Sequence, residues 1–112
     1  MKIYCGGLVV SGHVEVADRF FTRLKGWLGK KSVTDNEALL IIPCSSIHTL
    51  GMRIKIDVLF LDDNNLIIHM IESMKPSRIS SIIPHAKKVI ELPCGKISRS
   101  KLQLNAQIVF AD

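Results

Sequence analysis

Short apolar runs separated by turn residues make up most of the chain, which is the pattern of a protein built from short strands. Residues 54–61 (IKIDVLFL) and 66–71 (LIIHMI) are rich in β-branched and aromatic residues, and the DDNN between them is typical turn chemistry. These two runs therefore predict an antiparallel hairpin. Shorter apolar runs predict further strands at residues 38–42, 87–92 and 106–110.

The hydrophobic period changes over residues 17–31, where the sequence predicts its one helix. Phe20, Leu24 and either Trp27 or Leu28 recur at helical spacing. We expect Trp27, at this spacing, to be a core residue rather than a ligand-binding aromatic.

The order of these elements indicates the fold class. A Ser-Gly pair separates two apolar runs in residues 8–16 and predicts another hairpin. Strands that seldom alternate with helices indicate a mainly antiparallel sheet. We therefore expect a mainly β (α+β) fold: a small antiparallel β-barrel-like domain with one α-helix near the N-terminus, since closure into a barrel removes exposed strand edges. No repeat or linker divides the 112 residues, so residues 1–112 are expected to form a single domain.

The cysteines and the N-terminus bear on the compartment. Cys5, Cys44 and Cys94 are too few and too scattered for a disulfide framework, and no C-x-x-C motif is present. The apolar run at the N-terminus is broken by two glycines, and no stretch approaches the length of a membrane span. We expect a cytoplasmic protein with reduced thiols, no membrane span and no cofactor.

The net charge of +5 is unevenly distributed. Seven lysines and arginines against one glutamate lie in residues 73–105, so residues 75–101 could form a basic face that attracts an anionic partner. The favoured interpretation is an ordinary solvated surface. A nucleic-acid partner is not expected, because no aromatic residues are interleaved with the basic ones for base stacking.

Residues 43–65 (PCSSIHTLGMRIKIDVLFLDDNN) place a thiol, an imidazole, an arginine and three carboxylates around two apolar runs. Asp57 alternates with apolar neighbours, so its carboxylate should be buried and should need a partner. The candidate partners are Arg53, Lys55, His48 and main-chain N–H groups. A structural role for Asp57 is the favoured interpretation.

Cys44 and His48 allow two kinds of chemistry. With Cys94 they offer the sulfur and imidazole ligands that zinc or copper prefers, but the third ligand lies far along the chain, and no metal is expected. An imidazole next to a thiol could also activate a nucleophile, although no nucleophile motif surrounds it. The favoured interpretation of Cys44 is a small buried hydrophobe.

Three blocks of the chain resemble the domain of unknown function 192 family (DUF192, UPF0127). Residues 17–30 are similar to its "GLMGR"-type block, residues 39–63 to its central "PC.SIHT..M...ID..FLD" signature, and residues 89–95 to its "LELPAG" block. The resemblance implies a compact, mostly β, barrel-like domain with no established biochemical activity.

The chain also departs from the family pattern. Lys55 stands where relatives often have proline, and Ser77 stands where they often have an aromatic residue. Asn105 and Ala106 replace the late "GD" dipeptide, which removes the carboxylate of that turn. Cys94 replaces the usual alanine, which argues against a family-wide site built from two cysteines.

The favoured hypothesis is a non-enzymatic module that binds a small ligand or a protein partner. Its candidate ligand-binding residues are Cys44, His48, Thr49, Met52 and Arg53. An arginine there could recognise a carboxylate or a phosphate, and a methionine would be an adaptable apolar contact.

The remaining candidates are structural or catalytic. Asp57, Glu91 and Arg23 are expected to anchor the loops around the site. The rival hypothesis is a small hydrolase or transferase that uses His48 with Asp57 or Glu91 as acid and base. A weaker alternative is a metal carrier that uses Cys44 and His48.

Overall fold

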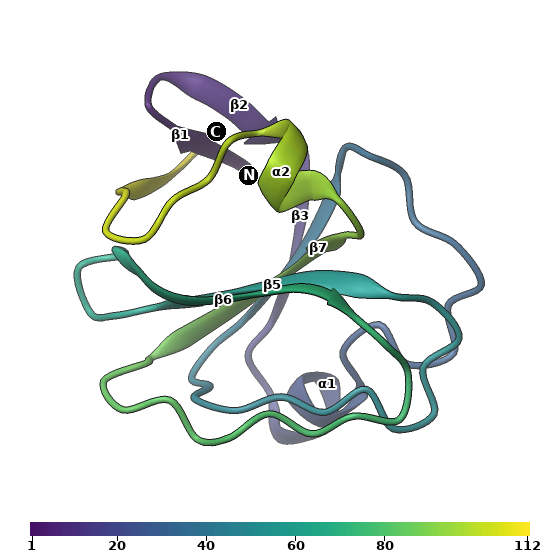
Figure 1. Ribbon diagram of the computed structural model, residues 1–112. Helices are drawn as coiled ribbons and strands as arrows, with labels where there is room; N and C mark the ends of the chain where they lie inside the picture. Colours follow the sequence, from purple (N-terminus) through teal and green to yellow (C-terminus); the bar gives the residue numbers. More distant parts are fainter.

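The computed structural model describes residues 1–112 and shows a mainly β protein with eight strands and two short helices (Figure 1). The strands are β1 (Lys2–Cys5), β2 (Leu8–Ser11), β3 (His13–Ala17), β4 (Glu37–Ile41), β5 (Ile56–Leu61), β6 (Ile67–Met74), β7 (Lys88–Pro93) and β8 (Ile108–Ala111). The helices are α1 (Phe20–Lys25) and α2 (Lys96–Arg99).

The strands form two separate sheets. The larger sheet has the order β3-β4-β7-β5-β6, and the smaller has the order β2-β1-β8. The predicted hairpin is confirmed as β5 and β6, which pair antiparallel. All other pairs are antiparallel too, except β3 with β4, which run parallel. Neither sheet closes on itself, so the expected barrel is replaced by two open sheets.

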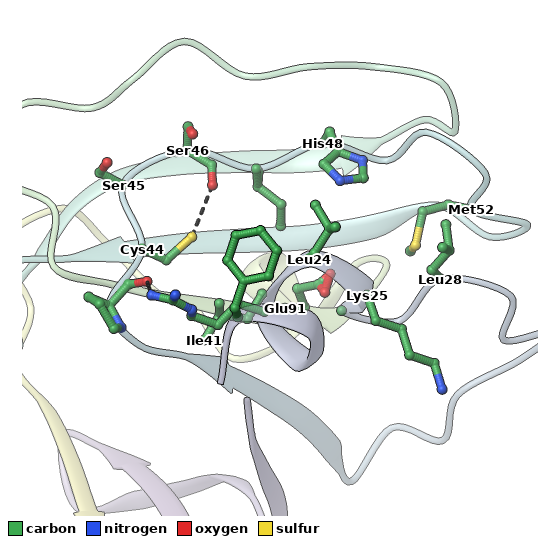
Figure 2. A pocket seen from close by; sticks show the side chains of 15 residues that line it. Leu24, Lys25, Leu28, Ile41, Cys44, Ser45, Ser46, His48, Met52 and Glu91 are labelled. Carbon is green, nitrogen blue, oxygen red and sulfur yellow. Dashed lines mark hydrogen bonds between the residues drawn. The ribbon is translucent and has the colours of Figure 1, made fainter. Parts of the chain in front are cut away.

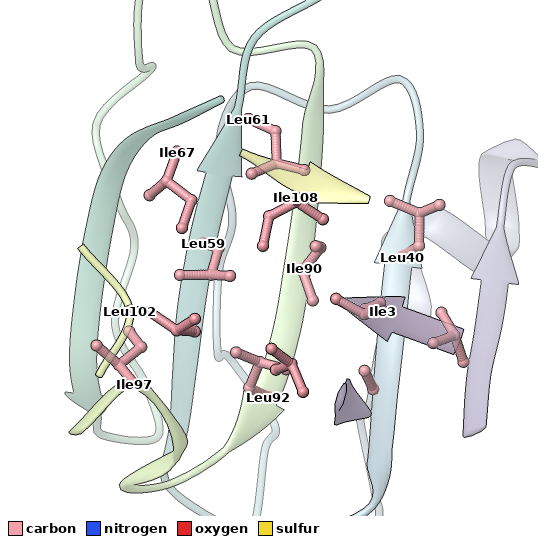
Figure 3. Close-up of a cluster of buried hydrophobic side chains, with 13 residues drawn as sticks. Ile3, Leu40, Leu59, Leu61, Ile67, Ile90, Leu92, Ile97, Leu102 and Ile108 are labelled. Atoms are coloured by element: carbon pink, nitrogen blue, oxygen red, sulfur yellow. The ribbon is translucent and has the colours of Figure 1, made fainter. Parts of the chain in front are cut away.

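The alternation of side chains along β5 divides the core into two clusters. Leu59 and Leu61 belong to a cluster between the larger sheet, β1, β8 and α2, which Figure 3 shows. Val58 and Phe60 point to the opposite face and belong to a second cluster with Trp27. Every β5 residue is buried, because both faces of the larger sheet are covered.

Helix α1 lies on the second of these faces, and it differs from the predicted helix. It has only six residues, and none of them is buried. Phe20 and Leu24 are 65% and 55% exposed, so the core does not cover this apolar face. Trp27 is confirmed as a core residue, with 2% of its surface exposed, but it lies in the turn after the helix.

The predicted hairpin over residues 8–16 is also wrong, because β2 and β3 belong to different sheets. The Ser11 hydroxyl donates to the main-chain oxygen of Asn36 at 2.6 Å, and the Gly12 N–H donates to its side-chain oxygen at 2.7 Å. These bonds fix the crossing point between the sheets. The turn at Gly6 and Gly7 instead joins β1 and β2.

No helix in the protein combines the length and the apolar character that crossing a bilayer requires.

Candidate functional site

A hollow of about 370 Å³ lies between α1 and the segment that follows β4. We call it the Glu91 hollow, after the carboxylate that lines it, and Figure 2 shows its side chains. Its lining consists of Phe20, Arg23, Leu24, Lys25, Gly26, Leu28, Ile41, Pro43, Cys44, Ser45, Ser46, Ile47, His48, Met52 and Glu91. Its volume is within the range of pockets that bind small molecules.

Glu91 reaches the hollow from β7, the middle strand of the larger sheet. Its neighbours Ile90 and Leu92 face the cluster under the smaller sheet, so alternation turns Glu91 to the α1 side. The residue is 2% exposed. Its Oε1 accepts the Trp27 main-chain N–H at 3.2 Å, and no hydrogen bond within the protein uses Oε2.

Burial raises the pKa of Glu91 from an ordinary value of 4.5 to about 7, and the Trp27 N–H offsets part of the rise. This carboxyl group therefore exchanges a proton near neutral pH. A buried carboxyl group with a free oxygen at the wall of a hollow is a strong candidate for ligand recognition.

Gly26 places the α1 wall against this carboxylate. Its φ of +50° ends the helix in a conformation that side-chain-bearing residues rarely adopt. A Cβ at this position would lie 2.5 Å from Glu91 Oε1. A side chain at position 26 would require the Glu91 carboxylate, which accepts the Trp27 N–H, to shift.

Lys25 and Arg23 both line the hollow and supply its positive charge. Arg23 also bonds to the segment after β4. Its Nη1 donates to the Pro43 main-chain oxygen at 3.2 Å, and its other N–H groups have no partner within the protein. No ion pair joins Arg23 to Glu91. The hollow thus contains an acid and a guanidinium that do not neutralise each other.

Cys44 and His48 line the other side of the hollow (Figure 2). The Cys44 thiol donates to the Ser46 main-chain oxygen at 2.9 Å. Burial raises the pKa of this thiol above its ordinary 9.0, and the nearby Glu91 adds to the rise. The thiol is therefore protonated at neutral pH and is a poor nucleophile. His48 Nδ1 accepts the Leu50 N–H at 3.3 Å, which leaves Nε2 to carry the proton of the neutral ring.

The structure separates the three remaining ligand-binding candidates. Met52 lines the Glu91 hollow. Thr49 is fully buried, and its hydroxyl donates to the Lys75 main-chain oxygen at 2.6 Å and accepts the Arg78 N–H at 2.9 Å. Arg53 is exposed and lies outside the lining of the hollow.

Asp57 is fully buried on β5, on the face away from the hollow. Its Oδ1 accepts the Ser73 N–H and its Oδ2 accepts the Ile97 N–H, both at 2.9 Å. Main-chain N–H groups, and not a charged side chain, are therefore its partners. They tie the end of β6 and the start of α2 to the larger sheet.

The sequence interpretation does not assign the apolar walls of the hollow. It predicts an apolar helical face of Phe20, Leu24 and either Trp27 or Leu28. In the structure Phe20, Leu24 and Leu28 line the hollow and remain partly exposed. The sequence interpretation predicts Arg23 and Glu91 as anchors, and both line the hollow as well. One feature of the sequence could have indicated that Arg23 and Glu91 belong to a site. They lie in residues 17–30 and 89–95, two of the three blocks that resemble the family.

Part of the expected basic face is used internally. Asp35 accepts the Lys96 ammonium at 3.0 Å and the Arg99 guanidinium at 2.5 Å, and these bonds lower the pKa of its carboxyl group. Lys88 donates to Asn65 Oδ1 at 2.5 Å. An anionic partner at residues 75–101 stays a prediction, with fewer free charges than the sequence suggests.

Metal-ligand geometry is absent from the structure. No group of three His, Cys, Asp or Glu side chains lies close enough together to hold a metal ion. Cys94 lies 3.3 Å from Ser73 Oγ and does not line the Glu91 hollow with Cys44.

Comparison with known proteins identifies relatives over nearly the whole chain. The DUF192 family model, described as an uncharacterized ACR, matches residues 5–110. A UPF0127 protein of Thermococcus sibiricus is 36% identical over 108 residues, which are 91% of this chain and 66% of that protein. A UPF0127 protein of Thermococcus gammatolerans is 35% identical over 97 residues, which are 81% of this chain and 61% of that protein. The chain thus spans a little under two thirds of the length of these relatives.

A crystal structure of a protein of unknown function from Novosphingobium aromaticivorans has a similar fold. It superposes with a TM-score of 0.80 at 14% identity and covers 87% of this chain and 74% of that one. At this identity the likeness concerns the fold alone.

Proposed function

We propose a ligand-binding role for this chain, which belongs to the DUF192 family of uncharacterised proteins. The chain would act as a binding module that holds a small organic ligand in the Glu91 hollow. One observation carries the proposal: a carboxylate that is only 2% exposed lines a hollow and uses only one of its two oxygens within the protein.

The cost of burying Glu91 supports a role in binding. Desolvation of an ionisable group is unfavourable, and a single main-chain N–H offsets only part of it here. A purely structural carboxylate would be expected to use both oxygens, as Asp57 does. A ligand that enters the hollow could donate to Oε2, which no protein group uses.

Apolar walls next to this acid also fit a binding pocket. Leu24, Leu28 and Met52 line the same hollow with surface that water hydrates poorly. Binding sites for small molecules commonly combine apolar walls with a few convergent polar groups.

A titration followed by amide NMR tests the proposal. Wild-type protein is titrated with amino acids, sugars, nucleosides and organic acids, while the ¹H–¹⁵N spectrum is recorded. We expect one class of compound to shift the amide signals of Trp27 and of residues 44–48 in wild type. The same shifts should appear in the control Glu72→Gln, which alters an exposed carboxylate on β6. They should be lost in Glu91→Gln. Shifts that are the same in all three proteins, or no shifts at all near the hollow, would contradict the proposal.

Acid–base catalysis is a second candidate function, because His48 and Glu91 line the same hollow and Glu91 titrates near neutral pH. The Cys44 thiol is not the nucleophile in this scheme, since its pKa is raised. Turnover of the compound that binds, lost in both His48→Ala and Glu91→Gln, would establish this function over simple binding.

We also propose a reducing compartment such as the cytoplasm. The three cysteines are all free, and Cys44 and Cys94 lie at different sites. Cysteines without disulfide partners are typical of proteins kept under reducing conditions.

A further inference from the structure

We infer that the ligand of the Glu91 hollow is a small zwitterion of the amino-acid type, an inference that rests on the proposed binding function. Its ammonium group donates to Glu91 Oε2, and its carboxylate accepts N–H groups of Arg23. Its apolar side chain packs against Leu24 and Leu28.

The opposite charges of the hollow carry this inference. Glu91 has one free oxygen, and Arg23 has N–H groups without a protein partner. The two side chains line one hollow but form no ion pair. A ligand that carries both charges gives each of them a partner in the same binding event.

The Cys44 thiol shows that both charges act on the same wall. Burial has the largest effect on the pKa of this thiol and raises it. Glu91 raises that pKa further, whereas Arg23 lowers it. A small molecule beside Cys44 would therefore experience the fields of both groups.

Ligands with a single charge fit less well. A simple cation would meet Arg23 and Lys25 in the lining of the hollow and a net charge of +5 on the whole chain. A simple anion would have to enter next to the buried Glu91 carboxylate. A neutral polyol would place its hydroxyl groups against the apolar walls. These hydroxyl groups would lose their hydration and would gain no hydrogen bonds from the walls.

The apolar wall defines the remaining part of the ligand. Leu24 and Leu28 come from α1 and the turn after it, and Met52 lies beside them (Figure 2). Methionine side chains adapt to irregular shapes. This surface suits an unbranched or aliphatic side chain, as in methionine or leucine.

The test is a calorimetric titration with L-methionine and three relatives that each lack one or both charges. These are 3-(methylthio)propylamine, N-acetyl-L-methionine and N-acetyl-L-methionine amide. We expect L-methionine to bind at least about tenfold more tightly than each relative, a ratio that corresponds to about 1.4 kcal/mol for one lost charged contact. We also expect Glu91→Gln and Arg23→Gln each to weaken its binding by about tenfold or more. Arg19→Gln, at an exposed arginine outside the lining of the hollow, should leave it unchanged.

The outcomes separate this inference from the proposed function. If a relative with one charge binds as tightly as L-methionine and depends on Glu91, the binding module stands and the zwitterion is wrong. If neither L-methionine nor L-leucine binds, the zwitterion is wrong as well, and the NMR titration with the other compound classes decides the proposed function on its own. Equal binding to wild type and to both hollow variants would place the amino acid elsewhere and overturn the inference.

Discussion

Gly26 lies against the carboxylate of Glu91 so closely that a Cβ on residue 26 would be 2.5 Å from Glu91 Oε1. This approach lets the Trp27 N–H donate to the same oxygen at 3.2 Å. The turn after α1 and the middle strand of the larger sheet are thus joined at the hollow, although these residues are far apart in the sequence.

Gly26→Ala should therefore destabilise the protein more than Gly29→Ala. Both glycines have a positive φ, so both substitutions carry a backbone penalty, and the ψ of −134° at Gly26 lies outside the left-handed helical region as well. Only position 26 adds a clash, because nothing lies within 4 Å of a Cβ at position 29. We expect an additional loss of about 1–3 kcal/mol at position 26, measured by urea unfolding. Equal losses for the two variants would show that the contact with Glu91 imposes no constraint.

The raised pKa of Glu91 predicts a pH-dependent stability. Between pH 4.5 and about 7 the folded state holds a proton that the unfolded state has lost, so stability decreases as pH rises through this window. A tenfold difference in proton affinity between the two states corresponds to about 1.4 kcal/mol, so the whole rise in pKa corresponds to roughly 3 kcal/mol. Glu91→Gln should match wild type below pH 4.5 and exceed its free energy of unfolding by roughly that amount above pH 7.

Denaturant unfolding at a series of pH values measures this difference. Glu72→Gln is the matched control, because Glu72 is exposed on β6. A constant difference between Glu91→Gln and wild type from about pH 4 to about pH 8 would mean that Glu91 titrates as an ordinary surface carboxyl group.

Asp57→Ala should be strongly destabilising. The substitution leaves the buried N–H of Ile97 and the partly buried N–H of Ser73 without an acceptor, at about 1–3 kcal/mol each. Asp63→Ala, at an exposed turn position, should change stability by less than about 0.5 kcal/mol. Hydrogen exchange provides a local measurement: the Ile97 and Ser73 amides should lose protection first. Unchanged exchange at both amides would contradict the anchoring role.

The Asp35 ion pairs predict a smaller effect of pH on the free energy of unfolding, and this effect appears at acid pH. Lys96 and Arg99 lower the pKa of Asp35, so its contribution is present above the ordinary pKa of 3.8 and is lost as pH falls through the lowered value. Asp35 is 66% exposed, which limits the loss in Asp35→Asn to under about 1 kcal/mol at neutral pH.

A comparison with Asp18→Asn isolates this effect, because the exposed Asp18 makes no ion pair. The deficit of Asp35→Asn relative to wild type should shrink as the pH falls below 3.8 toward about pH 2. If the Asp35→Asn deficit persists unchanged at that pH, then the ion pairs are not its cause.

The sequence predicts the β5–β6 hairpin and the burial of Asp57 because both depend on short-range rules. Alternation along residues 54–61 sorts Val58 and Phe60 from Leu59, and the structure places them in separate clusters. The turn residues between the strands identify the pairing. The alternation places Asp57 on the same face as Leu59 and Leu61, which the structure covers.

Other features depend on contacts between distant residues, which no local pattern contains. The Ser-Gly pair predicts a hairpin turn, but hydrogen bonds to Asn36 send β3 into a different sheet. The spacing of Phe20 and Leu24 indicates an apolar face but not its partner, and here that face lines a hollow. The chemistry of Glu91 likewise follows from the approach of α1 to β7. For this reason the sequence pattern places Glu91 among the anchors and Arg53 among the ligand-binding candidates.

Native mass spectrometry of the protein purified from cells without added ligand tests the central claim most directly. Wild type, Glu91→Gln and the Glu72→Gln control are prepared in parallel. The account predicts a bound small molecule in wild type and in the control, and its loss in Glu91→Gln. A bound mass that persists in Glu91→Gln, or three bare proteins that also fail to bind any compound in the NMR titration, would contradict it.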